Sequence, residues 1–262
     1  MGSRIGALFV SLVLAGTLPG LAAEPAAEVD VALVLAVDVS LSMTADEQSI
    51  QRGGYVEAFR SAAVQQAIRQ GLVGRIAVTY VEWAGMGNQR IVVPWTIISG
   101  SAEANAFADQ LAGSPPRRST WTSIASAIDF SVGLLASSGF EPMRRVIDVS
   151  GDGPNNQGRS VTRARDDAVA QGITINGLPL MLREPSGPWD IKDLDLYYRD
   201  CVIGGSGSFM VPVREREQFA AAIRTKIIRE VAGGGMVPLL QPAQTEPRGN
   251  CLAGERPNVD WD

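Results

Sequence analysis

The sequence contains no histidine and only two lysines, Lys192 and Lys226. Without histidine, neither a Ser-His-Asp triad nor a Cys-His pair can form, and every histidine-ligated metal site is excluded. A Ser-Lys dyad is disfavoured as well, because both lysines fall on polar or helix-like segments. These absences point away from the common forms of nucleophilic catalysis.

Cysteine is equally scarce, with Cys201 and Cys251 as the two examples. In an exported protein these residues could form one disulfide that joins the C-terminal tail to the domain. Two independent thiols are an equally good interpretation, because sequence spacing does not establish proximity.

Long apolar runs are absent after the first segment of the chain. Arg4 precedes an apolar run over residues 5–18, and small residues follow, with cleavage expected near Ala22 or Ala23. This layout predicts a secretory signal peptide over residues 1–23. The run is too short to indicate a membrane span. We therefore expect an exported protein, periplasmic or extracellular, with no membrane span in the mature chain.

The charge and length limit the remaining possibilities. The formal charge of the chain is −5, and it becomes one unit more negative once Arg4 is removed. An acidic chain without a basic stripe is a poor candidate for nucleic-acid binding, so no such partner is expected. The length suits one domain with a sizeable core, predicted over residues 24–232. A Pro-rich irregular tail is predicted over residues 233–262.

Strand-like runs alternate with helix-like segments through the domain. The short turn at residues 85–88 predicts an antiparallel hairpin, whereas near-continuous apolar strands indicate a parallel sheet covered on both faces. We therefore predict a doubly wound α/β fold with a mostly parallel six-stranded sheet, one antiparallel edge strand and helices on both faces. The predicted strands are 29–37, 75–83, 90–98, 145–150, 173–182 and 208–213, and the predicted helices are 50–68, 102–111, 122–136, 160–171, 190–201 and 219–231.

The end of the first predicted strand carries three oxygen-bearing side chains, Asp38, Ser40 and Ser42. Alternate residues of an extended backbone share a face, so one carboxylate and two hydroxyls can converge there. An oxygen-only set of this kind suits Mg²⁺, Mn²⁺ or Ca²⁺. On this pattern alone, a helix cap or a turn is the commoner role of Asp and Ser after a strand.

Two later segments add oxygen donors at the same predicted edge of the sheet. Asp152 follows an apolar strand beside a tight turn, and Thr120 opens a helix after a loop. The first and fourth major strands of such a fold end at neighbouring positions, so Asp152 is expected near Asp38. Thr122 is the alternative to Thr120, as a ligand or as the helix cap.

In their order and spacing, five of these residues resemble a known site. The metal-ion-dependent adhesion site of the von Willebrand factor A (vWA) domain family has the pattern Asp-x-Ser-x-Ser, then a loop Thr, then an Asp-Gly after an apolar strand. The residues that match are Asp38, Ser40, Ser42, Thr120 and Asp152. The resemblance covers roughly residues 29–232, and the segments around the site look like those of an uncharacterised group of exported bacterial relatives.

The resemblance implies one bound divalent cation, with Mg²⁺ favoured and Mn²⁺ or Ca²⁺ as alternatives. The cation would keep an open position for an exposed Asp or Glu of a protein partner. Asp148 and Ser150 share a face with Asp152, so Asp148 could orient a ligand or water, unless it bonds a loop backbone or an arginine. Arg117 and Arg118 could attract a partner's carboxylate to the rim, unless they only form a solvated loop.

Three functions are compatible with this pattern. The leading hypothesis is an exported adhesion or scaffold module, not an enzyme, that binds an acidic partner through the cation. A Mg²⁺-dependent hydrolase is the alternative, because an open metal position can activate water. A hydrolase of the haloacid dehalogenase type, however, would want Asp instead of Ser40 and a well-placed lysine. A structural exported domain with an unused site is the third possibility.

Overall fold

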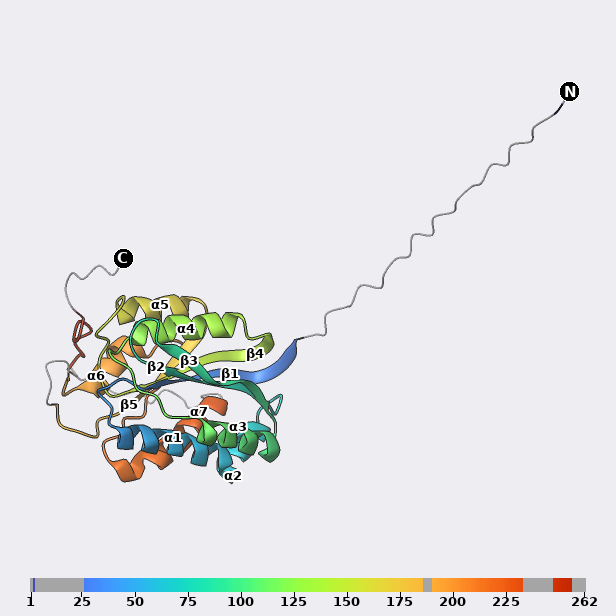
Figure 1. Ribbon diagram of the computed structural model, residues 1–262, viewed down its shortest axis with the longest axis horizontal. Coiled ribbons are helices and arrows are strands. Elements are labelled where there is room, and N and C mark those ends of the chain that lie inside the picture. The colour runs from blue at the N-terminus through green and yellow to red at the C-terminus, as the bar shows by residue number, and fades with distance from the viewer. Residues whose placement is uncertain (1, 3–25, 186–189, 233–246, 256–262) are drawn as a thin grey trace.

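The computed structural model describes residues 2, 26–185, 190–232 and 247–255 of the chain. The predicted signal peptide and most of the predicted tail lie outside these residues. The described part forms one sheet between two layers of helices (Figure 1). Within it, no helix combines the length and the apolar character that crossing a membrane requires.

The sheet has five strands in the order β3-β2-β1-β4-β5. Strands β1, β2, β4 and β5 run parallel, and β3 is antiparallel to β2, which agrees with the predicted hairpin and antiparallel edge. The strands are β1 (Ala27–Asp38), β2 (Ile76–Trp83), β3 (Gln89–Ile98), β4 (Phe140–Gly151) and β5 (Ile173–Pro179).

The predicted sixth strand, residues 208–213, is not a strand of this sheet. It lies beside β5 and forms only two isolated parallel bridges, from Gly177 to Met210 and from Leu180 to Val213. Val211 and Val213 donate their N–H groups to the carbonyls of Gly177 and Pro179, each at 3.0 Å, so Pro212 between them takes no part in the hydrogen bonding to β5. The predicted six-stranded sheet is therefore a five-stranded sheet with this bridged segment beside it.

Helices cover both faces of the sheet, as predicted. Figure 1 shows α4 and α5 on one face and α1, α2, α3 and α7 on the other. Their bounds are α1 (Ala45–Arg60), α2 (Ala62–Arg69), α3 (Ser101–Gly113), α4 (Ile124–Ala136), α5 (Val161–Ala170) and α7 (Phe219–Val231). Alternate residues of β1 pack into the two layers, which explains why its apolar run is nearly continuous.

Two predicted helices differ from those in the structure. The helix predicted over residues 50–68 is divided at Ser61, whose side chain accepts a hydrogen bond from the Val64 N–H and so begins α2. The helix predicted over residues 190–201 is reduced to α6 (Leu194–Tyr197) and a π-helical turn (Tyr198–Val202). In both segments the apolar spacing is helical, but local hydrogen bonds set the boundaries.

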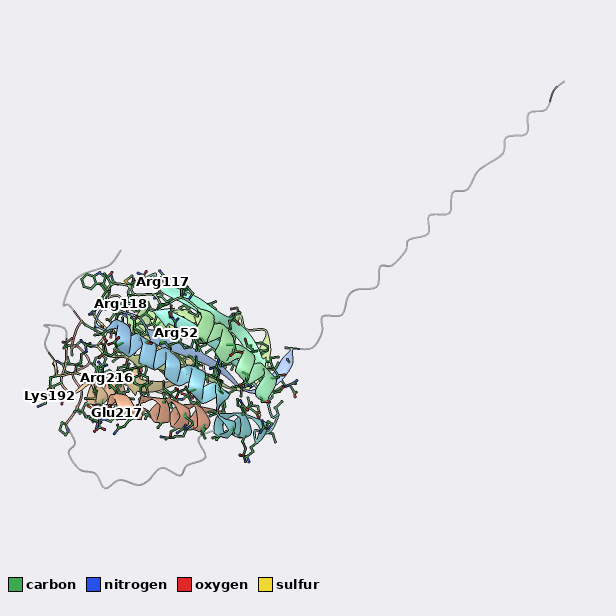
Figure 2. The ribbon with its side chains drawn as sticks, turned by 60° about the horizontal axis from the view of Figure 1, so that its bottom comes forward. Arg52, Arg117, Arg118, Lys192, Arg216 and Glu217 are labelled. Atoms are coloured by element: carbon green, nitrogen blue, oxygen red, sulfur yellow. A yellow bond between two sulfur atoms is a disulfide. The ribbon has the colours of Figure 1, made fainter. Side chains whose placement is uncertain are left out.

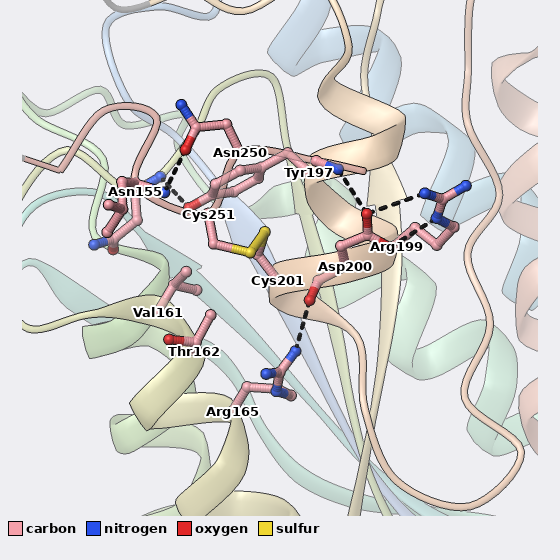
Figure 3. The surroundings of a disulfide bond; sticks show 12 residues. Asn155, Val161, Thr162, Arg165, Tyr197, Arg199, Asp200, Cys201, Asn250 and Cys251 are labelled. Carbon is pink, nitrogen blue, oxygen red and sulfur yellow. Dashed lines mark hydrogen bonds and ion pairs between the residues drawn. A yellow bond between two sulfur atoms is a disulfide. The ribbon is translucent and has the colours of Figure 1, made fainter. Parts of the chain in front are cut away.

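A disulfide between Cys201 and Cys251 holds the described C-terminal segment, residues 247–255, against the domain (Figure 3). Two hydrogen bonds support this attachment. The Gly249 N–H donates to the Asp200 carboxylate at 2.6 Å, and the Val161 N–H at the start of α5 donates to Glu255 at 2.9 Å. This segment is therefore bonded to the domain, and it contains turns but no helix or strand.

Charged side chains are buried between β4, β5 and α7. Lys226 Nζ lies 2.7 Å from Asp148 Oδ1 and also contacts Glu230, one helical turn away. The Asn176 amide donates to Glu230 at 3.2 Å. Burial raises the pKa of the Asp148 carboxyl, and it raises the pKa of Glu230 to about 7, while the lysine opposes both shifts. One buried lysine thus compensates two buried carboxyl groups.

Replacing this lysine should be costly. We expect Lys226→Met to lower the free energy of unfolding by about 3–5 kcal/mol, because it leaves buried carboxyl groups without their cation. Urea denaturation at neutral pH measures the change. The control is Lys192→Met at an exposed position, where the change should stay within about 0.5 kcal/mol. A loss as small as that of the control would show that the buried carboxyls need no cation.

Reducing the disulfide should weaken the fold to a similar extent. We expect the free energy of unfolding to fall by about 2–4 kcal/mol, because the bond closes a separation of 50 residues in the unfolded chain. Guanidinium denaturation of oxidised and reduced protein measures this loss, and the double variant Cys201→Ser/Cys251→Ser should behave like the reduced protein. Equal midpoints in all three samples would contradict the expectation.

Candidate metal centre

The parallel pairing of β1 with β4 places the ends of both strands side by side. The register runs from Ala27 opposite Phe140 to Val37 opposite Ser150. Asp38 is therefore the last residue of β1 at the edge where β4 ends, and Asp152 follows β4 directly. The topology alone brings two of the predicted ligands to one place.

Hydrogen bonds join the oxygen-bearing side chains at this edge. The Ser40 and Ser42 hydroxyls are 2.6 Å apart, and the Ser42 hydroxyl donates to Asp152 Oδ1 at 2.7 Å. The Ser40 N–H donates to Asp38 Oδ1 at 2.7 Å. Four of the five residues that the sequence predicted as ligands thus form one cluster.

Asp38 has an unsatisfied oxygen in this cluster. The residue is fully buried, and its Oδ2 has no hydrogen-bond partner among the described residues. Burial raises the pKa of Asp38 well above its ordinary value, and the nearby charge of Asp152 raises it further. A buried carboxylate oxygen without a donor, beside hydroxyls and a second carboxylate, is an environment that a hard divalent cation would satisfy.

The donors of the cluster fit such a cation by their chemistry. They are carboxylate and hydroxyl oxygens, the ligand class that Mg²⁺, Mn²⁺ and Ca²⁺ prefer. Nowhere in the described part of the chain do three or more histidine, cysteine, aspartate or glutamate side chains gather in a group that could hold a metal. A cation at this cluster would therefore depend on the serine hydroxyls as well as on the two carboxylates.

Gly151 permits the close approach of the two strand ends. A Cβ atom at this position would lie 2.9 Å from Asp38 Oδ2 and 3.0 Å from the hydroxyl oxygen of Tyr198. Tyr198 is buried, and its hydroxyl also has no hydrogen-bond partner among the described residues. A side chain at position 151 would therefore press on the unsatisfied oxygen of the cluster.

Asp152 contacts Arg183, which in turn contacts Glu47, and sequence reasoning missed both of these residues. Arg183, which follows β5, places Nη2 2.9 Å from Asp152 Oδ2 and Nε 3.0 Å from Glu47 Oε1. Burial raises the pKa of Asp152, while the Ser42 hydroxyl and the arginine act in the opposite direction. Glu47 had a sequence signal, since Thr44 and Glu47 have the spacing of a capping box, and they form one at the start of α1.

The loop that carries Thr120 lies beside the cluster. Ser119 forms a parallel bridge with Ser40, and its N–H donates to the Val39 carbonyl at 3.0 Å. Thr120 follows directly and is exposed, and its hydroxyl makes no hydrogen bond to a described residue. The structure therefore brings the Thr120 loop to the cluster without linking its hydroxyl to the other predicted ligands.

Thr122, the alternative to Thr120, has a structural role in this loop. Thr122 is buried, its N–H donates to Asn156 Oδ1, and its carbonyl accepts from the Asn156 N–H, each at 2.8 Å. The helix cap of α4 is Ser123, not Thr122. Asn155 adds a hydrogen bond to the Ala125 N–H at 3.1 Å. The two asparagines after Asp152 thus fix the start of α4.

Asp148 and Ser150 lie on the same face of β4, deeper than the cluster. The Ser150 hydroxyl accepts a hydrogen bond from Gln51 on α1 at 2.7 Å. Asp148 pairs with Lys226, as described above, so the predicted bond to a loop backbone or an arginine is wrong. Its predicted role in orienting a ligand or water stays a prediction.

The two arginines of the predicted rim behave differently. Arg118 donates to the carbonyls of Leu41 and Met43, at 3.0 Å and 2.5 Å, and so ties the Thr120 loop to the loop after β1. Arg117 is exposed, and Figure 2 shows both side chains at the end of the molecule where β1 finishes. Of the two exposed arginines, Arg118 therefore joins the loops, whereas Arg117 remains an exposed cation.

Exposed apolar side chains lie on three loops at the same edge of the sheet as the cluster. Leu41, Met86 and Trp121 are 51%, 41% and 43% exposed. The loops are tied together, since the Gly85 N–H donates to the Thr120 carbonyl at 3.1 Å and Ser119 pairs with Ser40. Trp121 also has a positive φ of 68°, which is uncommon for a residue other than glycine. The cluster therefore lies within a partly apolar, exposed rim.

The order and direction of the strands, with helices on both faces of the sheet, define the fold of a vWA domain. The chain belongs to a family described as protein of unknown function (DUF1194), whose model matches residues 28–235. The comparison with curated proteins finds no match.

Several solved structures are similar to this chain in fold. They include the open conformation of the pilus adhesin SpaC from Lactobacillus rhamnosus GG (12% identity, TM-score 0.56, 78% of this chain and 30% of that chain) and a von Willebrand factor type A protein from Catenulispora acidiphila (12%, 0.54, 79% and 43%). A third is proximal thread matrix protein 1 from the mussel byssus with a zinc-occupied MIDAS motif (11%, 0.54, 79% and 49%). This chain spans less than half the length of each.

The Gly151 contact yields a test of the cluster. We expect Gly151→Ala to weaken divalent-cation binding and to lower the free energy of unfolding by about 1–3 kcal/mol, because the added methyl group overpacks the space beside Asp38. Thermal unfolding and titration calorimetry with Mn²⁺ measure both effects. The control is Gly153→Ala, where a Cβ atom would meet nothing within 4 Å. Behaviour identical to this control would contradict the expectation.

Proposed function

We propose that this chain is an exported binding module that holds one divalent cation for an acidic side chain of a protein partner. Asp38, Ser40, Ser42, Thr120 and Asp152 would supply the ligands, and Mg²⁺ is the favoured ion, with Mn²⁺ or Ca²⁺ as alternatives. The observation that carries the proposal is the pair of carboxylates joined through Ser40 and Ser42, with one buried, unsatisfied oxygen on Asp38.

The charge of this ligand set explains why a partner's carboxylate would bind. Two carboxylates balance the charge of one divalent cation, and the remaining ligands are neutral hydroxyls. Five protein ligands would leave one position of an octahedral Mg²⁺ open, and the set would not surround the ion with excess negative charge. An incoming Asp or Glu adds a charged oxygen ligand that the serines cannot supply.

The rim supports a protein as the partner. A carboxylate alone gives little area of contact, whereas Leu41, Met86 and Trp121 offer apolar surface around the cation. Exposed tryptophan is a frequent anchor in protein interfaces. An acidic side chain flanked by apolar residues would match both features of this face.

The similar structures favour binding over catalysis. Among those with this fold, one is named a pilus adhesin and another a thread matrix protein, and one of the latter's structures has a metal in its MIDAS motif. Adhesive use of the cation is the function that we carry over from them. Export to the periplasm or the cell exterior rests on the predicted signal peptide.

Removing one ligand should abolish the binding of the cation. We expect Asp38→Asn to lower Mg²⁺ or Mn²⁺ affinity by about 100-fold or more, because the amide loses the charge that faces the ion. Titration calorimetry measures the affinity, and circular dichroism checks the fold. The control is Asp109→Asn on α3, an exposed carboxylate paired with Arg60, which should bind the cation as the wild type does.

Capture of a partner should depend on the same cation. The purified wild type should retain a protein from envelope extract in Mg²⁺ and release it in excess EDTA, whereas Asp38→Asn should retain none in either buffer. Retention that is unchanged by EDTA would overturn the proposal. So would equal metal affinity in the wild type and the Asp38 variant.

A further inference from the structure

Arg183 is the one cationic side chain in contact with a carboxylate of the cluster in the described part of the chain. Its Nη2 lies 2.9 Å from Asp152 Oδ2 and its Nε lies 3.0 Å from Glu47 Oε1. The guanidinium also donates to the carbonyl of Ser42. The arginine therefore contacts three segments, which are helix α1, the loop between β1 and α1, and the loop after β4.

These contacts complete the hydrogen bonding of Asp152. Its Oδ1 accepts from the Ser42 hydroxyl at 2.7 Å, and its Oδ2 receives the guanidinium. A divalent cation bound to this carboxylate would lie within a few ångströms of the arginine, where the two positive charges repel each other strongly. The guanidinium thus balances the negative charge of Asp152, which a bound metal ion would otherwise balance.

Glu47 gives Arg183 a fixed second partner. The Glu47 carboxylate is buried, and its Oε2 accepts from both the N–H and the hydroxyl of Thr44, each at 2.8 Å. Because the capping box holds Glu47 in place, the Nε contact can persist when Nη2 leaves Asp152. The side chain is 45% exposed and borders a cleft of about 310 Å³, so it has room to turn.

We propose that Arg183 is a tethered counter-cation that competes with the divalent metal for Asp152. The guanidinium neutralises the Asp152 carboxylate, so a divalent cation held by the same carboxylate would have to displace Nη2, while Glu47 would retain Nε. This inference rests on the metal-binding function proposed above, and it adds a residue that sets metal affinity.

Removing the guanidinium tests this competition, with Mg²⁺ alone as the probe. We expect Arg183→Gln, in the full chain, to bind Mg²⁺ about tenfold more tightly than the wild type in titration calorimetry, because one charge-assisted hydrogen bond no longer has to be broken. Without metal, the same variant should unfold at a lower temperature, and saturating Mg²⁺ should raise its Tm by more than it raises that of the wild type.

The matched control is Lys192→Gln. Lys192 borders the same cleft but forms no ion pair with a described residue, so its replacement removes one positive charge without removing the competitor. Its Mg²⁺ affinity should change by less than about threefold, since an exposed charge is screened by solvent and salt. An equal gain in both variants would mean that net charge, not competition for Asp152, sets the affinity, and would overturn the inference.

The remaining outcomes separate this inference from the proposed function. Unchanged or weaker Mg²⁺ binding by Arg183→Gln, with wild-type binding intact, overturns the competition and leaves the metal site standing. Binding by Arg183→Gln alone supports the strongest form of competition. If neither protein binds Mg²⁺, Mn²⁺ or Ca²⁺ while both remain folded, the metal function fails, and the role of Arg183 fails with it.

Discussion

The pairing of β1 with β4 is the constraint on which the candidate site depends. It joins Ser42 to Asp152 across 110 residues of sequence, and Gly151 lets the two strand ends approach without pressing on Asp38. A slip of one residue in this register would turn every side chain of one strand to the opposite face. The near-continuous apolar sequence of β1 does not fix the register by itself, so polar contacts at its end help to specify it.

The polar face of β4 continues from the cluster into the interior. Moving inward along the strand, Asp152 meets Ser42, Ser150 meets Gln51, and Asp148 meets Lys226. Neighbours on the opposite face are apolar and pack under α4 and α5. Buried polar groups are costly unless they are paired, and paired groups limit the arrangements that a core can adopt. These paired polar groups of β4 therefore hold α1 and α7 at defined positions relative to the candidate metal site.

Sequence reasoning predicted the fold well because apolar periodicity and topology determine it. The same reasoning placed Asp38 and Asp152 at one edge, since parallel strands end together. It missed Arg183, which lies in an irregular segment without a period, and it missed the buried role of Lys226, which interrupts an apolar helical stripe. Sequence reasoning also predicted a sixth strand over residues 208–213, where the structure has only isolated bridges. Contacts between distant irregular segments carry no local pattern, so only the structure reveals them.

Hydrogen bonds within the cluster bear on how it would bind a cation. A cation must replace the bond between the two serines, the bond from Ser42 to Asp152 and the contact of Asp152 with Arg183. Each replacement subtracts from the net affinity, because broken hydrogen bonds oppose the new ligand bonds. The unsatisfied Oδ2 of Asp38 acts in the other direction, since a cation would give it a partner. The net affinity for a cation therefore depends on two opposing energies. The partner gained by the buried Asp38 oxygen favours binding, and the hydrogen bonds broken within the cluster oppose it. Single substitutions around the site should therefore change the affinity.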